Sequence, residues 1–166
     1  VRFTPRPEGG FAVTGQPLPE DAEFEAVLNG QVIAKLNSPL GNERPGALLA
    51  WPLADIMRGS ALAPVAVFRP SESQAIEEVA SSESKLWVKV LDDVSGKLIE
   101  LTPGAGGWTQ REIALPANST IQIAETSGKG DTAFVTVESM LSPPTLYAVS
   151  SEGEPVAVAS EPAQFD

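Results

Sequence analysis

This sequence contains no histidine and no cysteine. Without histidine, neither a Ser-His-Asp triad nor a histidine-based metal site can form within the chain. Without cysteine, there can be no disulfide, no thiolate zinc site and no cysteine nucleophile. The G-x-S-x-G pattern of a hydrolase nucleophile elbow is missing as well. We therefore expect no catalytic residue, no metal ligand and no cofactor in this chain.

Long apolar runs are also missing, since no stretch approaches the roughly 18–20 residues that a membrane helix needs. Basic residues are few: 11 Lys and Arg face 22 Asp and Glu, for a net charge of −11. An acidic surface repels phosphate backbones. We therefore expect neither a membrane nor a nucleic-acid partner, and we interpret the charge as a solubility feature. The composition fits any cellular compartment, and we expect the bacterial cytoplasm or periplasm.

Short alternating stretches are what the chain does contain, together with 15 prolines and 14 glycines. From Ala133 to Glu138 the side chains alternate with the period of two that is typical of a pleated strand. Ser142–Pro144 is predicted to break this strand, because proline has no backbone N–H to donate. Thr145–Val149 and Pro155–Ala159 are predicted as two more strands, separated by the turn cluster Ser151–Glu154. The pattern predicts a β-meander.

The meander is the last of three repeats, each with four predicted strands. The third strands begin at residues 47, 97 and 145 and the fourth at 65, 110 and 155, so the period is 45–50 residues. In chain order, the twelve predicted strands are Glu23–Leu28, Gln31–Leu36, Ala47–Leu53, Val65–Arg69, Ile76–Ser81, Lys85–Leu91, Lys97–Thr102, Gln110–Leu115, Thr120–Thr126, Thr132–Val137, Thr145–Ser150 and Pro155–Ala159. Four strands in such a period are the signature of a propeller blade. The predicted fold is all-β: a partial β-propeller of about three four-stranded antiparallel blades.

The predicted domain organisation follows from the repeats. Residues 1–19 are interpreted as the outer strand of a preceding blade and a linker. Residues 20–166 are interpreted as three consecutive blades, approximately 20–70, 71–116 and 117–160. Twelve strands could also pack as a β-sandwich adhesion domain, but the regular period argues against that alternative.

Local patterns predict details of this fold. Asn29-Gly30 is a strong hairpin signal, and Asp55–Gly59 is predicted as one helical turn that Asp55 caps and Gly59 ends. The middle strands of each blade should be the most buried. The side chains expected to be inaccessible are Val88, Val90, Leu98, Val135, Val137, Leu146 and Ala148.

Several residues could carry chemistry, but each has a plainer structural interpretation. A Ser-Lys dyad needs a buried lysine, and the alternation places Lys35 and Lys89 on exposed positions. Asp92-Asp93 is typical of a turn rather than of a cation site. We expect a solvated edge from the four glutamates Glu72, Glu77, Glu78 and Glu83.

The three tryptophans could form a sugar-stacking platform, but aromatic residues in repeated strands more often pack between blades. These residues are Trp51, Trp87 and Trp108. Asn118-Ser119-Thr120 is a formal glycosylation triplet, with meaning only in a eukaryotic secretory pathway.

Four segments resemble the prolyl oligopeptidase family of serine peptidases. Phe134–Tyr147 (FVTVESMLSPPTLY) resembles the family's last blade, where S-F-L-(S/T)-P precedes (T/S)-L-Y; here Met140 replaces the phenylalanine. Three further segments match the family in order: Gly46–Ala50 (GALLA), Val79–Gly96 (VASSESKLWVKVLDDVSG) and Gly107-Trp108. The closing Pro162–Asp166 is similar to the junction between propeller and hydrolase domain. The resemblance covers Phe24–Asp166.

The resemblance implies a function without catalysis. In the family, the triad lies on an α/β-hydrolase domain, and the propeller gates access of short peptides to it. The chain would then be a fragment holding the last three of seven blades. Its implied partners are the missing blades and the hydrolase domain, or a second copy of the chain in a dimer, and, in the parent, short peptide substrates. The alternative is a free-standing propeller-type binding module with no peptidase parent.

Overall fold

A computed structural model describes residues 2–5, 11–14, 18–59, 63–140, 142–150 and 153–162, with the backbone alone at 2–5 and 11–14. The chain divides into two compact units, residues 1–66 and 67–166, and each is described by itself. The predicted linker residue Pro17, part of the turn Ser151–Glu154, and all but the first residue of Pro162–Asp166 lie outside the described residues.

The first unit begins with a two-stranded antiparallel sheet. Strand β1 (Arg2–Pro5) pairs with β2 (Phe11–Thr14), and Phe3 lies opposite Val13. Two strands are present where a single outer strand was expected. The assignment of residues 1–19 to a preceding blade, and the blade limits beyond it, stay predictions.

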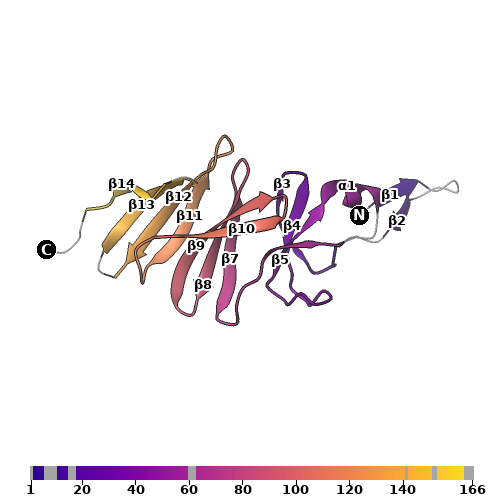
Figure 1. Cartoon of the computed structure of the whole chain (residues 1–166), viewed down its shortest axis with the longest axis horizontal. Coiled ribbons are helices and arrows are strands. Elements are labelled where there is room, and N and C mark those ends of the chain that lie inside the picture. Colours follow the sequence, from indigo (N-terminus) through magenta and orange to yellow (C-terminus); the bar gives the residue numbers. More distant parts are fainter. Residues whose placement is uncertain are drawn as a thin grey trace. The chain divides into compact units, whose positions relative to one another are not determined.

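Four strands then form a sheet in the order β3-β4-β5-β6 (Figure 1). Their bounds are β3 Glu23–Leu28, β4 Gln31–Lys35, β5 Leu48–Pro52 and β6 Val65–Phe68. The Asn29-Gly30 hairpin is confirmed: both residues have positive φ, 49° and 70°, as a two-residue turn of this type requires.

A short helix follows the third strand of this sheet. Helix α1 (Leu53–Arg58) ends at Gly59, which adopts the left-handed conformation as predicted. The prediction that Asp55 caps it is wrong, because the N-cap is Pro52 and no side chain caps the helix. Asp55 lies in the first turn instead, where an acidic side chain is favoured by the helix dipole.

The second unit contains two four-stranded antiparallel sheets. The first has the order β10-β9-β8-β7, with β7 Gln74–Ser81, β8 Leu86–Asp92, β9 Ser95–Gly104 and β10 Gly107–Ile113. The second has the order β11-β12-β13-β14, with β11 Thr120–Thr126, β12 Thr132–Ser139, β13 Ser142–Ser150 and β14 Val156–Ser160. Each strand pairs with its neighbour in the sequence, so both sheets are meanders.

The predicted break at Ser142–Pro144 is wrong in its position. The chain turns between β12 and β13, and β13 already begins at Ser142. Both prolines lie within β13. The pairing of β12 with β13 is irregular there, between Val137 and the Ser139–Ser142 pair. Proline is tolerated where a strand begins or its ladder is irregular, because no ladder bond is lost there.

An apolar cluster of described residues joins these two sheets. Trp87 and Leu98 of the first sheet pack with Ile121, Val135 and Val137 of the second, all at most 4% exposed. Burial is confirmed for five of the seven predicted core residues: Val88, Val90, Leu98, Val135 and Val137.

Leu146 and Ala148 are only half-buried, so this part of the prediction is wrong. They pair with Thr136 and Phe134 on the face of β12–β13 opposite to the apolar cluster. We call this the open face of the last sheet.

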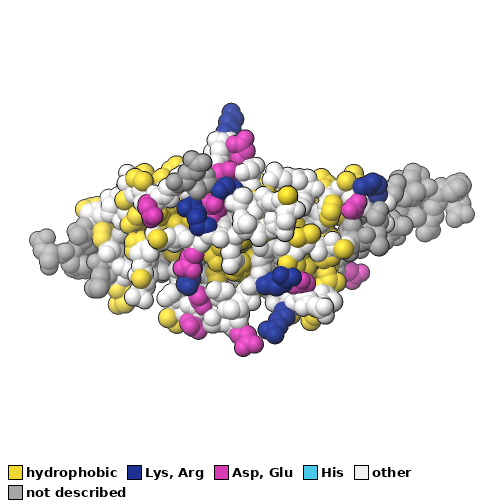
Figure 2. Space-filling model, in the orientation of Figure 1, with side chains coloured by type: hydrophobic (Ala, Val, Ile, Leu, Met, Phe, Trp, Pro, Cys, Tyr) yellow, Lys and Arg dark blue, Asp and Glu magenta, His cyan; other side chains and the backbone are white. Residues whose placement is uncertain are grey.

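Three four-stranded antiparallel sheets confirm the all-β class, with α1 as a minor exception. Among the described residues, no helix is both long and apolar enough to cross a membrane. On the face shown in Figure 2, acidic and basic side chains are interspersed.

Candidate functional site

The contact between the sheets β7–β10 and β11–β14 brings together several polar groups from both sheets. We call it the blade seam. The β7–β8 and β11–β12 turns come together at one of its ends (Figure 1). Period-2 strands direct alternate side chains into the seam, and the two turns add polar groups at its edge.

Asp131, just before β12, bonds to the neighbouring sheet at three points. Its Oδ1 accepts hydrogen bonds from Ser82 Oγ and from the Ser84 backbone N–H, both at 2.8 Å. Its Oδ2 accepts a third from Ser84 Oγ at 2.5 Å. Burial alone would raise the pKa of Asp131, but hydrogen bonds from Ser84 and Ser82 outweigh it and lower the pKa. Asp131 therefore favours its charged, hydrogen-bond-accepting form.

Further bonds surround this carboxylate. Buried Trp87 donates Nε1–H to Ser82 Oγ at 3.0 Å, which ties the Asp131 network to the apolar cluster. Thr126 Oγ1 donates to Ser81 O at 2.8 Å, and the Glu83 N–H donates to Gly130 O at 3.3 Å. The two turns are thus joined through side chains and backbone alike.

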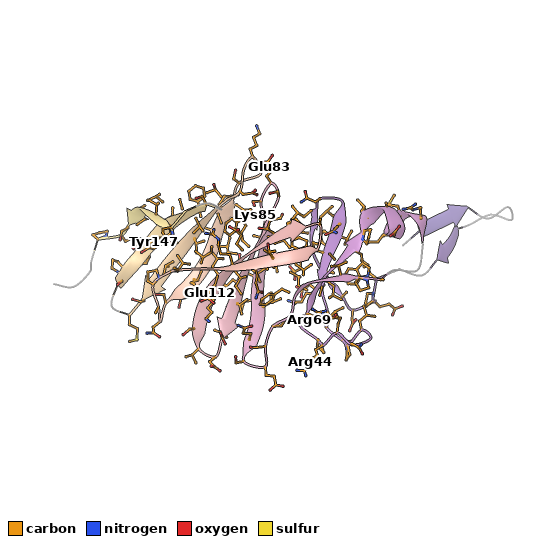
Figure 3. The ribbon with its side chains drawn as sticks, in the orientation of Figure 1. Arg44, Arg69, Glu83, Lys85, Glu112 and Tyr147 are labelled. Carbon is orange, nitrogen blue, oxygen red and sulfur yellow. The ribbon has the colours of Figure 1, made fainter. Side chains whose placement is uncertain are left out.

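A buried carboxylate lies behind the turns. Glu100 is 4% exposed, and its two oxygens pair with Lys85 Nζ and Arg111 Nη2, each at 2.8 Å (Lys85 is labelled in Figure 3). Arg111 also donates to Ser150 O of the other sheet at 2.9 Å. Because one cation holds Glu100 and reaches across the seam, this ion triad connects the two sheets as well.

The opposite end of the seam holds a pocket of about 430 Å³. Its walls come from the β8–β9 turn, the segment before β11 and the end of β12, and two of its side chains, Val94 and Met140, are 93% and 102% exposed. Gly96 closes the seam beside it: a Cβ there would lie 3.3 Å from Ser119 O, closer than most such contacts. The described lining residues are mainly uncharged and polar, and Glu138 is the one charged residue among them.

The two lysines considered for a Ser-Lys dyad are not exposed as predicted. Lys35 pairs with Glu23 at 2.8 Å and Lys89 with Glu77 at 3.0 Å, and their side chains are only 20% and 19% exposed. Their stems lie along the sheets while carboxylates hold the charged ends. Within the described part of the chain, both ammonium groups are thus held by carboxylates, an arrangement that serves an ion pair rather than a Ser-Lys dyad.

The acidic residues considered in the sequence take part in turns, in contacts between strands or in the exposed surface. Asp93 has a positive φ of 53°, and Asp92 accepts a hydrogen bond from Ser73 Oγ at 2.8 Å, which lowers its pKa. Glu72, Glu77 and Glu83 are exposed, whereas Glu78 is half-buried and accepts a bond from the Ile123 N–H across the seam at 3.4 Å. Within the described residues, no group of three or more acidic side chains is arranged to hold a metal.

The tryptophans form no exposed platform. Trp51 and Trp87 are at most 1% exposed, within separate apolar clusters, and Trp108 is half-buried. Asn118 of the formal triplet lines the pocket with a positive φ of 54°.

Sequence reasoning did not single out Asp131, which lies between the predicted strands Thr120–Thr126 and Thr132–Val137. The serines it contacts lie 49 and 47 positions away. The only available signal was Ser82 and Ser84 at the equivalent turn one repeat earlier, because turns one period apart meet at the same end of neighbouring blades.

Comparisons with known proteins agree with the fold. Residues 47–161 match the sequence model of the prolyl oligopeptidase N-terminal β-propeller domain. An uncharacterized peptidase of Sinorhizobium fredii is 31% identical over 157 residues, which are 90% of this chain and 22% of that protein. An uncharacterized peptidase of Rickettsia prowazekii is 23% identical, over 78% of this chain and 19% of that protein.

The structure of a post-proline cleaving enzyme from Rickettsia typhi superposes with a TM-score of 0.77 at 19% identity, over 95% of this chain and 24% of that one. At that identity the likeness concerns the fold alone, and it bears out the partial propeller. The chain spans about a fifth of the length of the curated relatives it matches.

Proposed function

Since this chain belongs to the prolyl oligopeptidase family as part of its N-terminal β-propeller domain, we propose that it is the non-catalytic propeller portion of a longer serine peptidase. In that role it limits which peptides reach the active site of a separate hydrolase domain. The single observation that carries this proposal is the match to the propeller domain in a chain without histidine.

The lack of histidine supports a protein in which this chain is non-catalytic and a separate hydrolase domain carries out the reaction. A serine peptidase of this class needs a histidine between nucleophile and carboxylate to move the proton. With none among 166 residues, the chemistry has to come from another part of the protein. The relatives named as peptidases are long enough to contain such a part, because this chain covers only 22% and 19% of them.

The open face of the last sheet supports a partner. Phe134, Leu146 and Ala148 lie on it, only partly buried, and Val156 beside them in β14 is 61% exposed. Apolar side chains that remain partly exposed on one sheet face can mark the site where another protein surface binds. The proposed cover is a further blade of the parent or, where the parent is missing, a second copy of this chain.

Expression of the full-length protein tests the proposal. It should cleave a chromogenic Gly-Pro peptide, and a serine-reactive phosphonate should abolish the activity. Folded proteins that carry the same Gly-Pro sequence should be cut far more slowly than the short peptide. A full-length protein without any phosphonate-sensitive hydrolysis would contradict the peptidase assignment and favour a free-standing binding module.

A further inference from the structure

The pocket at the end of the blade seam opposite Asp131 combines three kinds of side chain. Hydroxyl and amide groups form most of its described lining, from Ser95, Asn118, Ser119, Thr120 and Ser139. Glu138 adds a carboxylate, and Val94 and Met140 add apolar surface that is 93% and 102% exposed. Its volume of about 430 Å³ lies in the range of ordinary ligand sites. The pocket is therefore large enough for a long side chain of a partner.

The charge of this pocket favours a cation. Within the described part of the chain, Glu138 has neither an ion pair nor a side-chain hydrogen bond, and no lysine or arginine lines the pocket. Other exposed carboxylates of the same unit do have cations, since Glu77 pairs with Lys89 and Glu112 with Lys97. A lysine or arginine side chain fits both features of the pocket, because its charged end would pair with Glu138 while its apolar stem covers the exposed apolar surface.

The path of the chain indicates where such a side chain comes from. The Glu161 N–H donates to Pro144 O at 3.0 Å, so the chain leaves β14 at the end of the sheet where β13 begins. The pairing of Ser139 with Ser142 places the end of β12, and with it the pocket, at that same end. Because β12 and β14 are both neighbours of β13, they lie two strand spacings apart, about 10 Å (Figure 1).

The continuation of the parent protein therefore starts close to the pocket. The similarity of Pro162–Asp166 to the junction between propeller and hydrolase domain implies that this domain follows residue 166. A short tether gives the residues it carries a high effective concentration at the pocket. Charge complementarity adds specificity more than affinity, so an acidic pocket selects a basic side chain from this neighbouring segment.

We propose that the pocket binds a lysine or arginine side chain from the part of the parent that follows residue 166, and that Glu138 is the residue that selects it. The contact fixes the ends of β11 and β12 against the partner domain. This inference rests on the proposed function, since it needs a parent that continues into a hydrolase domain.

Photochemical cross-linking of the full-length protein identifies the occupant. Met140 is replaced by p-benzoyl-phenylalanine, which couples to C–H bonds that it contacts, and mass spectrometry locates the coupled residue. We expect coupling within one chain to a segment beyond residue 166, at or next to a lysine or arginine. The same photoreactive residue in place of Glu154, exposed at the opposite end of the same sheet, should not give this product. Coupling only to residues 1–166 or to a second copy, or no coupling, would overturn the proposal.

Charge reversal tests the carboxylate in the same full-length protein. Glu138 is exposed, so Glu138→Lys should fold, and it should speed amide hydrogen exchange in the coupled segment at least about tenfold because like charges would then face each other. Glu138→Asp keeps the charge and should have a smaller effect, whereas Glu154→Lys, with the same charge change at the opposite end, should have none. Unchanged exchange in Glu138→Lys would overturn the role of Glu138.

Neither readout depends on catalysis, so the two proposals fail in different ways. A protein that couples as expected but shows no phosphonate-sensitive hydrolysis of a Gly-Pro peptide would refute the peptidase assignment alone. An active peptidase without coupling from position 140 to the segment beyond residue 166 would refute this inference alone.

Discussion

Asp131 and Val137 lie on or next to the same strand, yet each is held by a different kind of force. Asp131 depends on hydrogen bonds that favour its charged form. Val137 depends on removal of apolar surface from water, since it is 4% exposed in the cluster between two sheets. Different substitutions therefore test the two residues.

The stabilising effect of Asp131 should depend on pH. Its pKa in the folded chain is lowered from the ordinary 3.8, so its contribution is fully present above the unfolded-state pKa and is lost as the pH falls through the folded-state pKa. Chemical denaturation should show wild type more stable than Asp131→Asn at pH 7, with the gap shrinking below about pH 4. In the Asp131→Asn background, Ser84→Ala should have less effect than in wild type. A gap that widens on acidification would contradict the assignment.

Val137→Asp should unfold the chain or lower its free energy of unfolding by several kcal/mol, because an unpaired carboxylate would be buried among apolar side chains. The matched control is Thr136→Asp, one residue away on the open face, where the new carboxylate remains partly in water. Thermal denaturation followed by circular dichroism compares the two. Equal melting temperatures would mean that the two faces of β12 are wrongly assigned.

At the scale of whole elements, some features followed from the residues themselves and others depended on neighbouring elements. The Asn29-Gly30 turn formed as predicted, because positive φ at both residues is a local requirement that these residue types meet. Asp55 does not set the start of α1 as predicted, because the incoming strand β5 places Pro52 at the N-cap. Pro143 and Pro144 lie in β13 because the preceding turn ends before them, and the strand begins at Ser142. Strand ends depend on ladder partners as well as on the residues themselves.

The β3–β4 hairpin gives an element-scale prediction. Gly30→Ala should reduce the free energy of unfolding by about 1 kcal/mol, because φ is +70° there and a side chain disfavours that conformation. Gly106→Ala is the control, since Gly106 is not in the left-handed region and a Cβ would meet no atom within 4 Å. Urea denaturation of both variants should place Gly106→Ala near wild type. Equal destabilisation of the two would show that backbone conformation is not the cause.

At the scale of the whole molecule, two features bear on the proposed function. The chain contains no histidine, and the described side chains of Phe134, Leu146 and Ala148 on the open face are only half-buried.

The isolated chain should hydrolyse a chromogenic Gly-Pro peptide no faster than buffer does. The reason is that no triad can be assembled from its residues. Preparations must be free of full-length enzyme, which mass spectrometry can verify. A rate that a serine-reactive phosphonate abolishes in such a clean preparation would contradict the non-catalytic role.

We expect the chain in solution to be a dimer or a complex with other blades of the parent, because the open face would otherwise remain in water. Its net charge of −11 opposes association only modestly at physiological salt, where screening acts within about 8 Å. Light scattering across a hundredfold dilution measures the mass. A constant mass of one chain would show that the open face needs no partner.

The sequence by itself determined the strand content, the three repeats and the exclusion of histidine and cysteine chemistry, because periodicity and composition are local properties of the chain. The resemblance of Phe134–Tyr147 and three other segments also identified the family that the match to residues 47–161 bears out. Only the tertiary structure decided that Asp131 meets Ser82 and Ser84, that Glu100 is buried between two cations, and that Leu146 lies on an open face. Alternation separates the two faces of a strand without telling which face another sheet covers, and contacts between residues about one repeat apart exist only once the sheets have packed.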